Sequence, residues 1–175
     1  MARITVNETG TQPLLIISTD VANGNIQTGN IVGANALSVG CLQDITITSS
    51  TGVFSWTDFC SVDINKLPTP ADNEIATNVV IDDEKYFGNS SAAGNSAANL
   101  GMASLSQNKV EVQFLVVWNN DDLANVVNGG QSNGTYWTSG VGYVTSLAPT
   151  VSPEAPVWVT PMTLAVDGTM YNGNG

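Results

Sequence analysis

The sequence predicts a mainly β fold, an antiparallel β-sandwich or small barrel with one or two short flanking α-helices. Apolar and polar residues alternate in several separate stretches, and this period of two is the pattern that a pleated strand imposes. Helical patterns are short and do not alternate regularly with strands, so no βαβ rhythm indicates a parallel sheet. The 175 residues, of which 42% are hydrophobic, are sufficient for one core. We therefore treat residues 1–175 as a single domain.

Short strands and turns are predicted in the first third of the chain. Residues 1–12 are polar and are interpreted as an N-terminal arm or an edge strand, and Leu14 to Thr19 form the first strand candidate. Ile26 to Leu42, with its scattered glycines, suggests short strands joined by tight turns. Residues 43–60 predict a hairpin whose turn is the Ser49–Gly52 cluster, because apolar and polar residues alternate on both sides of it.

Residues 66–108 are predicted to leave the sheet as a long loop excursion. Thr69 to Asp72 has the hydroxyl, proline and carboxylate pattern of a helix start, and Ile75 to Ile81 can be a strand. Asp82 to Gly88 is predicted as a turn or a short helix with a glycine cap. The small and polar residues of 88–101 are typical of a functional or mobile loop.

The C-terminal part holds the clearest strand patterns. Val110 to Trp118 alternates regularly and becomes apolar on both faces, which predicts a strand in the middle of the fold. Residues 120–129 predict a short helix with an asparagine cap, first-turn carboxylates and a glycine stop. The apolar stripe of this helix, which must pack on the sheet, is Leu123, Val126 and Val127. Residues 136–168 predict a strand, a proline-bearing connection and a second strand, and 172–175 a flexible tail.

The charge balance excludes tight binding of nucleic acid. The chain has 15 acidic residues against 4 basic ones, a net charge of −11, so it lacks the lysines and arginines that neutralise phosphates. An acidic lining that repels DNA agrees with the same physics. No apolar run approaches the ~20 residues of a membrane span, so we expect no membrane contact and a chain that is made and first kept in a cytoplasm.

The sequence contains no complete catalytic or metal-binding motif. Because it has no histidine, it has no His-dependent triad and no His-ligated metal. Residues 63–74 imitate a calcium loop, but Leu67 and Pro68 replace a ligand and the obligatory glycine. The carboxylates of 82–84 and 121–122 could serve a glycosidase, although a solvated turn and helix capping explain them. We predict no catalytic residue, no metal, no cofactor and no enzymatic activity.

The cysteines and tryptophans leave alternatives open. Cys41 and Cys60 flank the predicted hairpin and could face each other, but two buried free thiols are the favoured interpretation, because cysteine packs as a small hydrophobe. Four tryptophans could form a platform on which sugars stack, although aromatics at strand spacing more often belong to a core or an interface. These tryptophans are Trp56, Trp118, Trp137 and Trp158.

Three runs near the C-terminus carry a resemblance to a known family. Gly142–Leu147, Ser152–Val157 and Thr163–Gly168 form a strand, an acidic turn and a last strand that ends near a glycine. Together with the strand–short helix–strand order of 110–147 and the acidic balance, they resemble the major tail tube proteins of long-tailed, siphovirus-like bacteriophages. The loop 88–108 matches no element of that family.

The resemblance implies a structural virion protein of the tail, assembled in the cytoplasm of a bacterial host. Six copies would form a ring, their sheets would join into an inner β-barrel, and the rings would stack into a hollow tube. Other tail proteins would be partners, and DNA would pass through the lumen without specific binding. The candidate ring-stacking residues of the excursion are Asp82, Asp83, Glu84, Asn89 and Asn95. The candidate inner-barrel residues, of which the small set on 142–146 is expected to face the lumen, are Gly142, Val144, Ser146, Thr163 and Ala165.

Two other functions remain compatible with the sequence. A β-sandwich virion protein of the capsid decoration type shares the low charge and the Thr/Asn-rich surface, but it would form monomers or small closed oligomers. A carbohydrate-binding module would require exposed, coplanar aromatic side chains. Electron microscopy of the purified protein separates the tail tube hypothesis from both.

Overall fold

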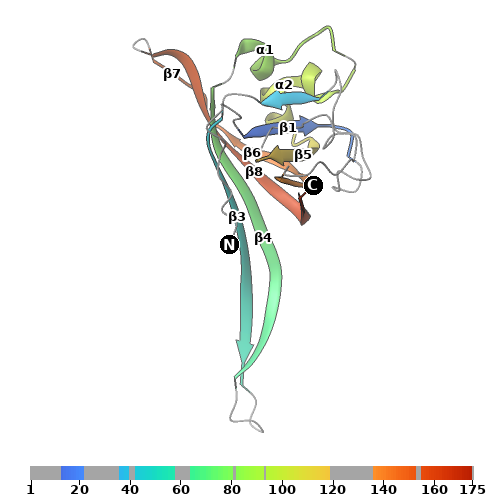
Figure 1. Ribbon diagram of the computed structural model, residues 1–175, viewed down its shortest axis with the longest axis vertical. Helices are drawn as coiled ribbons and strands as arrows, with labels where there is room; N and C mark the ends of the chain where they lie inside the picture. Colours follow the sequence, from blue (N-terminus) through green and yellow to red (C-terminus); the bar gives the residue numbers. More distant parts are fainter. Residues whose placement is uncertain are drawn as a thin grey trace.

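The computed structural model of the chain describes residues 13–21, 36–39, 42–57, 64–80, 82–92, 94–118, 136–152 and 155–174. Antiparallel pairing joins the described strands into one sheet in the order β2-β1-β5-β6-β8-β4-β3, and β7 pairs with β8. The strands are β1 (Leu14–Ser18), β2 (Leu37–Val39), β3 (Leu42–Trp56), β4 (Asn65–Val80), β5 (Glu111–Val117), β6 (Tyr136–Leu147), β7 (Thr150–Ser152) and β8 (Ala155–Asn174). The helices are α1 (Asp83–Phe87) and α2 (Ala97–Gln107). Over the described residues, this arrangement confirms the predicted class, mainly β and antiparallel, with α1 and α2 as short helices (Figure 1).

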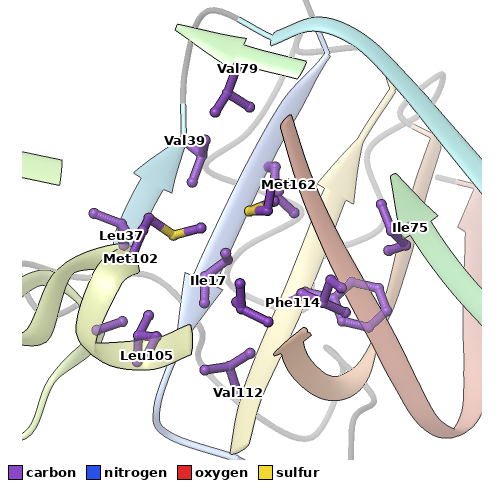
Figure 2. Packing of buried hydrophobic residues seen from close by; sticks show 14 of the residues in the cluster. Ile17, Leu37, Val39, Ile75, Val79, Met102, Leu105, Val112, Phe114 and Met162 are labelled. Carbon is purple, nitrogen blue, oxygen red and sulfur yellow. The ribbon is translucent and has the colours of Figure 1, made fainter. Parts of the chain in front are cut away.

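The main hydrophobic core lies between one face of the sheet and α2. Strand residues two positions apart point to the same side, so alternate residues of the strands supply this core. Figure 2 shows Ile17, Phe114 and Ile75 from three strands, with Met102 and Leu105 of α2 in the same cluster. All five side chains are fully buried, and removing such apolar surface from water is the main stabilising term of a domain.

Strand β5 is covered on both faces. Every residue from Val112 to Val117 is buried, as the apolar run at this place in the sequence predicted. Phe114 belongs to the main core, whereas Leu115 belongs to a second cluster on the opposite face, together with Trp137 of β6. The predicted central strand is therefore confirmed.

The β3–β4 hairpin is much longer than the sequence predicted and extends well beyond the rest of the sheet (Figure 1). The predicted turn at Ser49–Gly52 is wrong, because β3 continues through it and Phe54 pairs with Leu67 of β4. Gly52 serves a bulge instead: a Cβ at this position would come within 2.4 Å of Thr69 Oγ1. Ser and Thr around the glycine extend readily as strand residues when a partner strand is available.

The predicted excursion, 66–108, is corrected in two places. Its first part is β4, so the helix start predicted at Thr69–Asp72 is wrong, and Pro70 lies where the pairing with β3 is irregular and a missing N–H is tolerated. The predicted short helix at Asp82–Gly88 is confirmed as α1. Residues 97–107 of the predicted loop 88–108 form α2, which Ser96 caps by accepting a hydrogen bond from Asn99 N at 3.3 Å.

Gly88 and Gly101 allow α1 and α2 to approach each other closely. Gly88 and Gly101 have φ of 94° and 68°, a conformation that residues with a side chain rarely adopt. A Cβ on Gly101 would come within 2.3 Å of Gly88 N, and one on Gly88 within 2.0 Å of Asn99 O. The backbones of α1 and α2 are therefore in direct contact, which only glycine permits.

Several predicted features lie outside the described residues. These are the N-terminal arm 1–12, both cysteines, the first ligand of the calcium-like loop, and the helix 120–129 with its stripe of Leu123, Val126 and Val127. The flexible tail predicted at 172–175 is different in the structure, where 172–174 form the end of β8 and pair with β6. Within the described part of the chain, no helix is long and apolar enough to cross a membrane.

Candidate assembly surfaces

One face of the sheet carries small and polar side chains over four neighbouring strands. Directly paired residues of antiparallel strands share a face, so the register identifies its members. We call this surface the polar sheet face, and the apolar Val141 and Pro161 also lie on it, paired with Asp167 and Asn78. Its small or polar members are Thr46, Thr48, Glu74, Ala76, Asn78, Tyr143, Ser146, Thr163, Ala165 and Asp167. A shallow hollow of about 310 Å³ lies over part of it, between Thr46, Asn78, Ser146 and Thr163. None of these ten side chains is buried.

The charge on and beside the polar sheet face is acidic. Glu74 and Asp167 lie on it, Asp44 lies at its edge beside Asn78, and Glu111 lies at the opposite edge beside Tyr143. The carboxylate of Asp44 accepts hydrogen bonds from Asn78 N at 2.8 Å and Asn78 Nδ2 at 2.6 Å. Among the described strands the only basic residue is Lys66, which lies far from this surface in the long hairpin.

Tyr143 and Glu111 form one polar contact of this surface. The Tyr143 hydroxyl donates to Glu111 Oε1 at 3.1 Å. This hydrogen bond, followed by the negative charge of Glu111, raises the pKa of Tyr143 above its ordinary value, because both favour the protonated phenol. A side-chain hydrogen bond thus joins β5 and β6, and it holds the carboxylate of Glu111 at the edge of the polar sheet face.

The structure divides the predicted inner-barrel residues between two faces. Ser146, Thr163 and Ala165 lie on the polar sheet face, whereas Gly142 and Val144 lie on the opposite face, where Gly142 is buried and Val144 belongs to the main core with 1% of its surface exposed. The prediction that Gly142 and Val144 face a lumen is therefore corrected. A bulge between Val144 and Ser146 shifts the alternation by one residue, and the sequence carries no signal for it.

The predicted ring-stacking residues gather around α1, with one exception. Asp82 caps the helix by accepting from Lys85 N at 2.8 Å and pairs with Lys85 Nζ at 3.1 Å. Asp83 and Glu84 follow in the first turn, and Asn89 donates its side-chain N–H to Glu84. Asn95 instead contacts the end of β1, where its carbonyl accepts from Thr19 Oγ1 at 3.1 Å. Stacking through these residues stays a prediction.

Opposing effects act on the Asp82 carboxyl. Partial burial raises its pKa, but the hydrogen bonds from Lys85 and the charge of that ammonium group lower it by more, so the pKa of Asp82 lies below its ordinary value. The helix N-terminus favours the same ionised form. Lys85 is thereby engaged by Asp82, and the first turn of α1 presents Asp83 and Glu84 as negative charge.

Sequence reasoning missed a set of exposed apolar residues in the long hairpin. We call its outer part, residues 49–57 and 64–71, the distal hairpin. Its apolar side chains are Val53, Phe54, Trp56, Ile64 and Leu67, exposed by 42% to 62%. The rings of Phe54 and Trp56 stack with centroids 5.9 Å apart. Contiguous exposed apolar groups mark an interaction surface. The available signal in the sequence is Pro68 with Pro70, because proline within a strand marks a stretch that lacks a second partner strand.

The three tryptophans whose side chains the structure describes do not share one platform, and that of Trp158 lies outside the described side chains. Trp137 is 8% exposed in the second hydrophobic cluster, and Trp118 is half-buried with its Nε1 donating to Thr138 Oγ1 at 3.1 Å. Trp56 is exposed, but it lies in the distal hairpin. Among the described side chains, no group of three or more His, Cys, Asp or Glu residues is placed to hold a metal ion.

Comparisons with known proteins find the same fold in tail assemblies. No protein-family model and no curated protein sequence matches the chain. A chain in the tail of an empty GTA particle, solved with helical refinement and C6 symmetry, aligns with a TM-score of 0.54 at 12% identity over 91% of this chain and 95% of its own. The SPP1 tail tube aligns with a TM-score of 0.54 at 14% identity over 98% of this chain and 80% of its own. The chain therefore shares the fold of the subunits in these two tail structures.

Proposed function

We propose that this chain is a tail tube subunit of a phage or phage-like particle. The observation that supports it most is the shared fold, which covers nearly the whole chain in both comparisons. The GTA tail has C6 symmetry, so we propose rings of six copies that stack into a hollow tube. The location in a virion tail, assembly in the host cytoplasm and contact with other tail proteins belong to the same proposal.

The sheet edges suggest how a ring closes. Among the described strands, β2 and β3 end the main path of the sheet, and each has a neighbour on one side only. Exposed backbone N–H and C=O groups on such edges are a template for pairing with another chain. Pairing with neighbouring copies in a closed ring leaves no free edge. We propose that the sheets join in this way into a continuous inner barrel.

The polar sheet face is our candidate for the surface of the lumen. The opposite face packs on α2 and is filled by the main core, so only the polar sheet face is available. Ser146, Thr163 and Ala165 offer small side chains, while Glu74 and Asp167 supply negative charge. DNA that passes such a surface meets repulsion and no cation to hold it. No specific binding of DNA is part of this function.

Electron microscopy of the purified protein tests the proposed function. We expect six-fold rings or hollow tubes at high protein concentration. Sedimentation velocity on the same samples gives the oligomer size independently. A protein that stays monomeric at high concentration would overturn the proposal, and small closed oligomers that never stack would favour the capsid decoration type instead.

A further inference from the structure

The hollow on the polar sheet face has the composition of a site for a cation. Its polar walls are the carboxylate of Asp44 and the hydroxyls of Thr46, Ser146 and Thr163, all of which can accept hydrogen bonds. Its volume of about 310 Å³ is at the lower end of the range for ligand sites, so it suits one small group. Pro161 adds an apolar wall, against which the methylene groups of a long basic side chain can pack.

The carboxylate of Asp44 is held in one orientation but keeps its charge. Asn78 donates its backbone N–H to Oδ1 at 2.8 Å and its Nδ2 to Oδ2 at 2.6 Å, so each oxygen retains a further lone pair. Both donors are neutral, and none of the described residues that line the hollow is basic. Because Asn78 already engages both oxygens, a single ammonium group fits better than the side-by-side hydrogen bonds of a guanidinium fork. The hollow therefore favours lysine over arginine.

A second carboxylate lies on the same face at a fixed spacing from the hollow. Glu74 is four residues from Asn78 along β4, and both side chains lie on the polar sheet face. At the rise of a strand these four residues span about 13 Å. Asp72, two residues further along β4, is exposed on the same side. A partner chain that lies extended along β4 has the same rise, so its side chains at positions i and i+4 would meet Asp44 and Glu74 together.

We propose that the polar sheet face binds an extended segment of a partner protein that carries lysines four residues apart. One ammonium group enters the hollow beside Asp44, and the other lies beside Glu74. Charge complementarity supports this occupant, because Asp167 and Glu111 add to the negative charge of the same surface, and opposite charges across an interface give specificity. Both carboxylates of the site belong to one copy of the chain, so the site does not depend on the proposed function.

Two short peptides test the spacing. The first is a blocked peptide of seven residues, with lysines at the second and sixth positions and serine, alanine or glycine elsewhere. The second has the same composition with lysines at the second and fifth positions, so its ammonium groups lie on opposite sides of the extended chain. We expect the first peptide to bind about fivefold more tightly at low salt, as measured by fluorescence anisotropy. Replacing its lysines by arginines should weaken the binding.

Two variants of the protein test the hollow itself. Asp44→Asn removes its charge with little change in shape, so the first peptide should lose about fivefold in affinity and its advantage over the second. Ser146→Lys places an ammonium group of the protein in the hollow and should have the same effect, and since Ser146 is exposed the fold should be kept. Asp20→Asn is the matched control, because Asp20 is exposed beyond β1 and changes the net charge equally. Circular dichroism checks the fold of each variant.

The outcomes separate this site from the tail tube function. Equal binding of the two lysine peptides, or equal losses in Asp44→Asn and Asp20→Asn, would reduce the interaction to general attraction by an acidic protein and overturn the proposal. Absence of binding by either peptide would overturn it as well. A protein that forms no rings but prefers the first peptide would keep this site and lose the tail tube function, and rings without that preference would do the opposite.

Discussion

Single residues fix where the charge of the polar sheet face lies. Asp44 accepts two hydrogen bonds from Asn78, and Glu111 accepts one from the hydroxyl of Tyr143. A carboxylate that accepts such hydrogen bonds has fewer orientations than one that is free in solvent. The negative charges beside the proposed lumen are therefore placed by neighbouring strands, at positions that repeat in every copy.

The contact between Tyr143 and Glu111 gives a prediction for pH. Glu111→Gln removes the negative charge and weakens the hydrogen bond, so the pKa of Tyr143 should fall towards its ordinary value of about 10. In the wild type the raised pKa means that this contact stabilises the fold below that pH and is lost as the pH rises through the pKa of Tyr143. Alkaline titration of tyrosinate absorbance measures it, with Glu84→Gln as the control that should change nothing. An unchanged titration curve in Glu111→Gln would contradict the contact.

At the scale of secondary structure, contact between the backbones of α1 and α2 determines how these two helices pack. Helices α1 and α2 are short, and neither would be stable alone. They are held together where Gly88 and Gly101 bring the two backbones into contact, and α2 then places Met102 and Leu105 in the main core. The small residues that look like a loop in the sequence are thus a packing requirement.

Substitution of Gly101 tests this interpretation. Gly101→Ala combines a positive φ with a Cβ that would clash with backbone, so we expect a loss of about 2–4 kcal/mol in the free energy of unfolding. Gly94→Ala is the matched control: its φ is +45° but nothing lies within 4 Å, so only the conformational cost of ~1 kcal/mol remains. Urea titration measures both. Equal losses in the two variants would show that the helix contact is unimportant.

The sequence predicts those elements whose pattern is local and regular. β5 and β6 follow directly from alternation, β1 from its short apolar run, and α1 from its cap, because these signals depend on neighbours in the chain. The continuation of β3 through Gly52 and the start of β4 at Asn65 could not be predicted, because they depend on pairing between distant residues. For the same reason, residue type could not predict that Ser146 and Val144 lie on opposite faces of the sheet, because a bulge between them causes it.

At the scale of the whole molecule, the layout suits a subunit better than a free protein. The sheet keeps its main core on one face, and over β3, β4, β6 and β8 it exposes a polar, acidic surface on the other, which the second hydrophobic cluster occupies at β1 and β5. The distal hairpin extends beyond the body with apolar side chains on both faces (Figure 1). The exposed apolar side chains of the distal hairpin and the free edges of the sheet both favour association with other chains.

Reversal of charge on the polar sheet face tests its place in the tube. Glu74→Lys adds a cation to the surface that we propose lines the lumen, so assembled tubes should retain short duplex DNA at low salt and release it as salt rises. Asp20→Lys, an exposed residue beyond β1, is the control with the same change in charge. Co-sedimentation of DNA with tubes gives the measurement. Equal retention by the two variants would remove the polar sheet face from the lumen.

The bulge between Val144 and Ser146 has a consequence for anyone who would redesign the surface. Counting by twos along β6 gives the wrong side of the sheet after this point, since Tyr143 and Ser146 share a face although they are three apart. A chemical label attached at 143 or 146 would emerge from the sheet, whereas the same label at 144 would displace the core. The irregularity thus decides which positions of the strand can be decorated without unfolding the subunit.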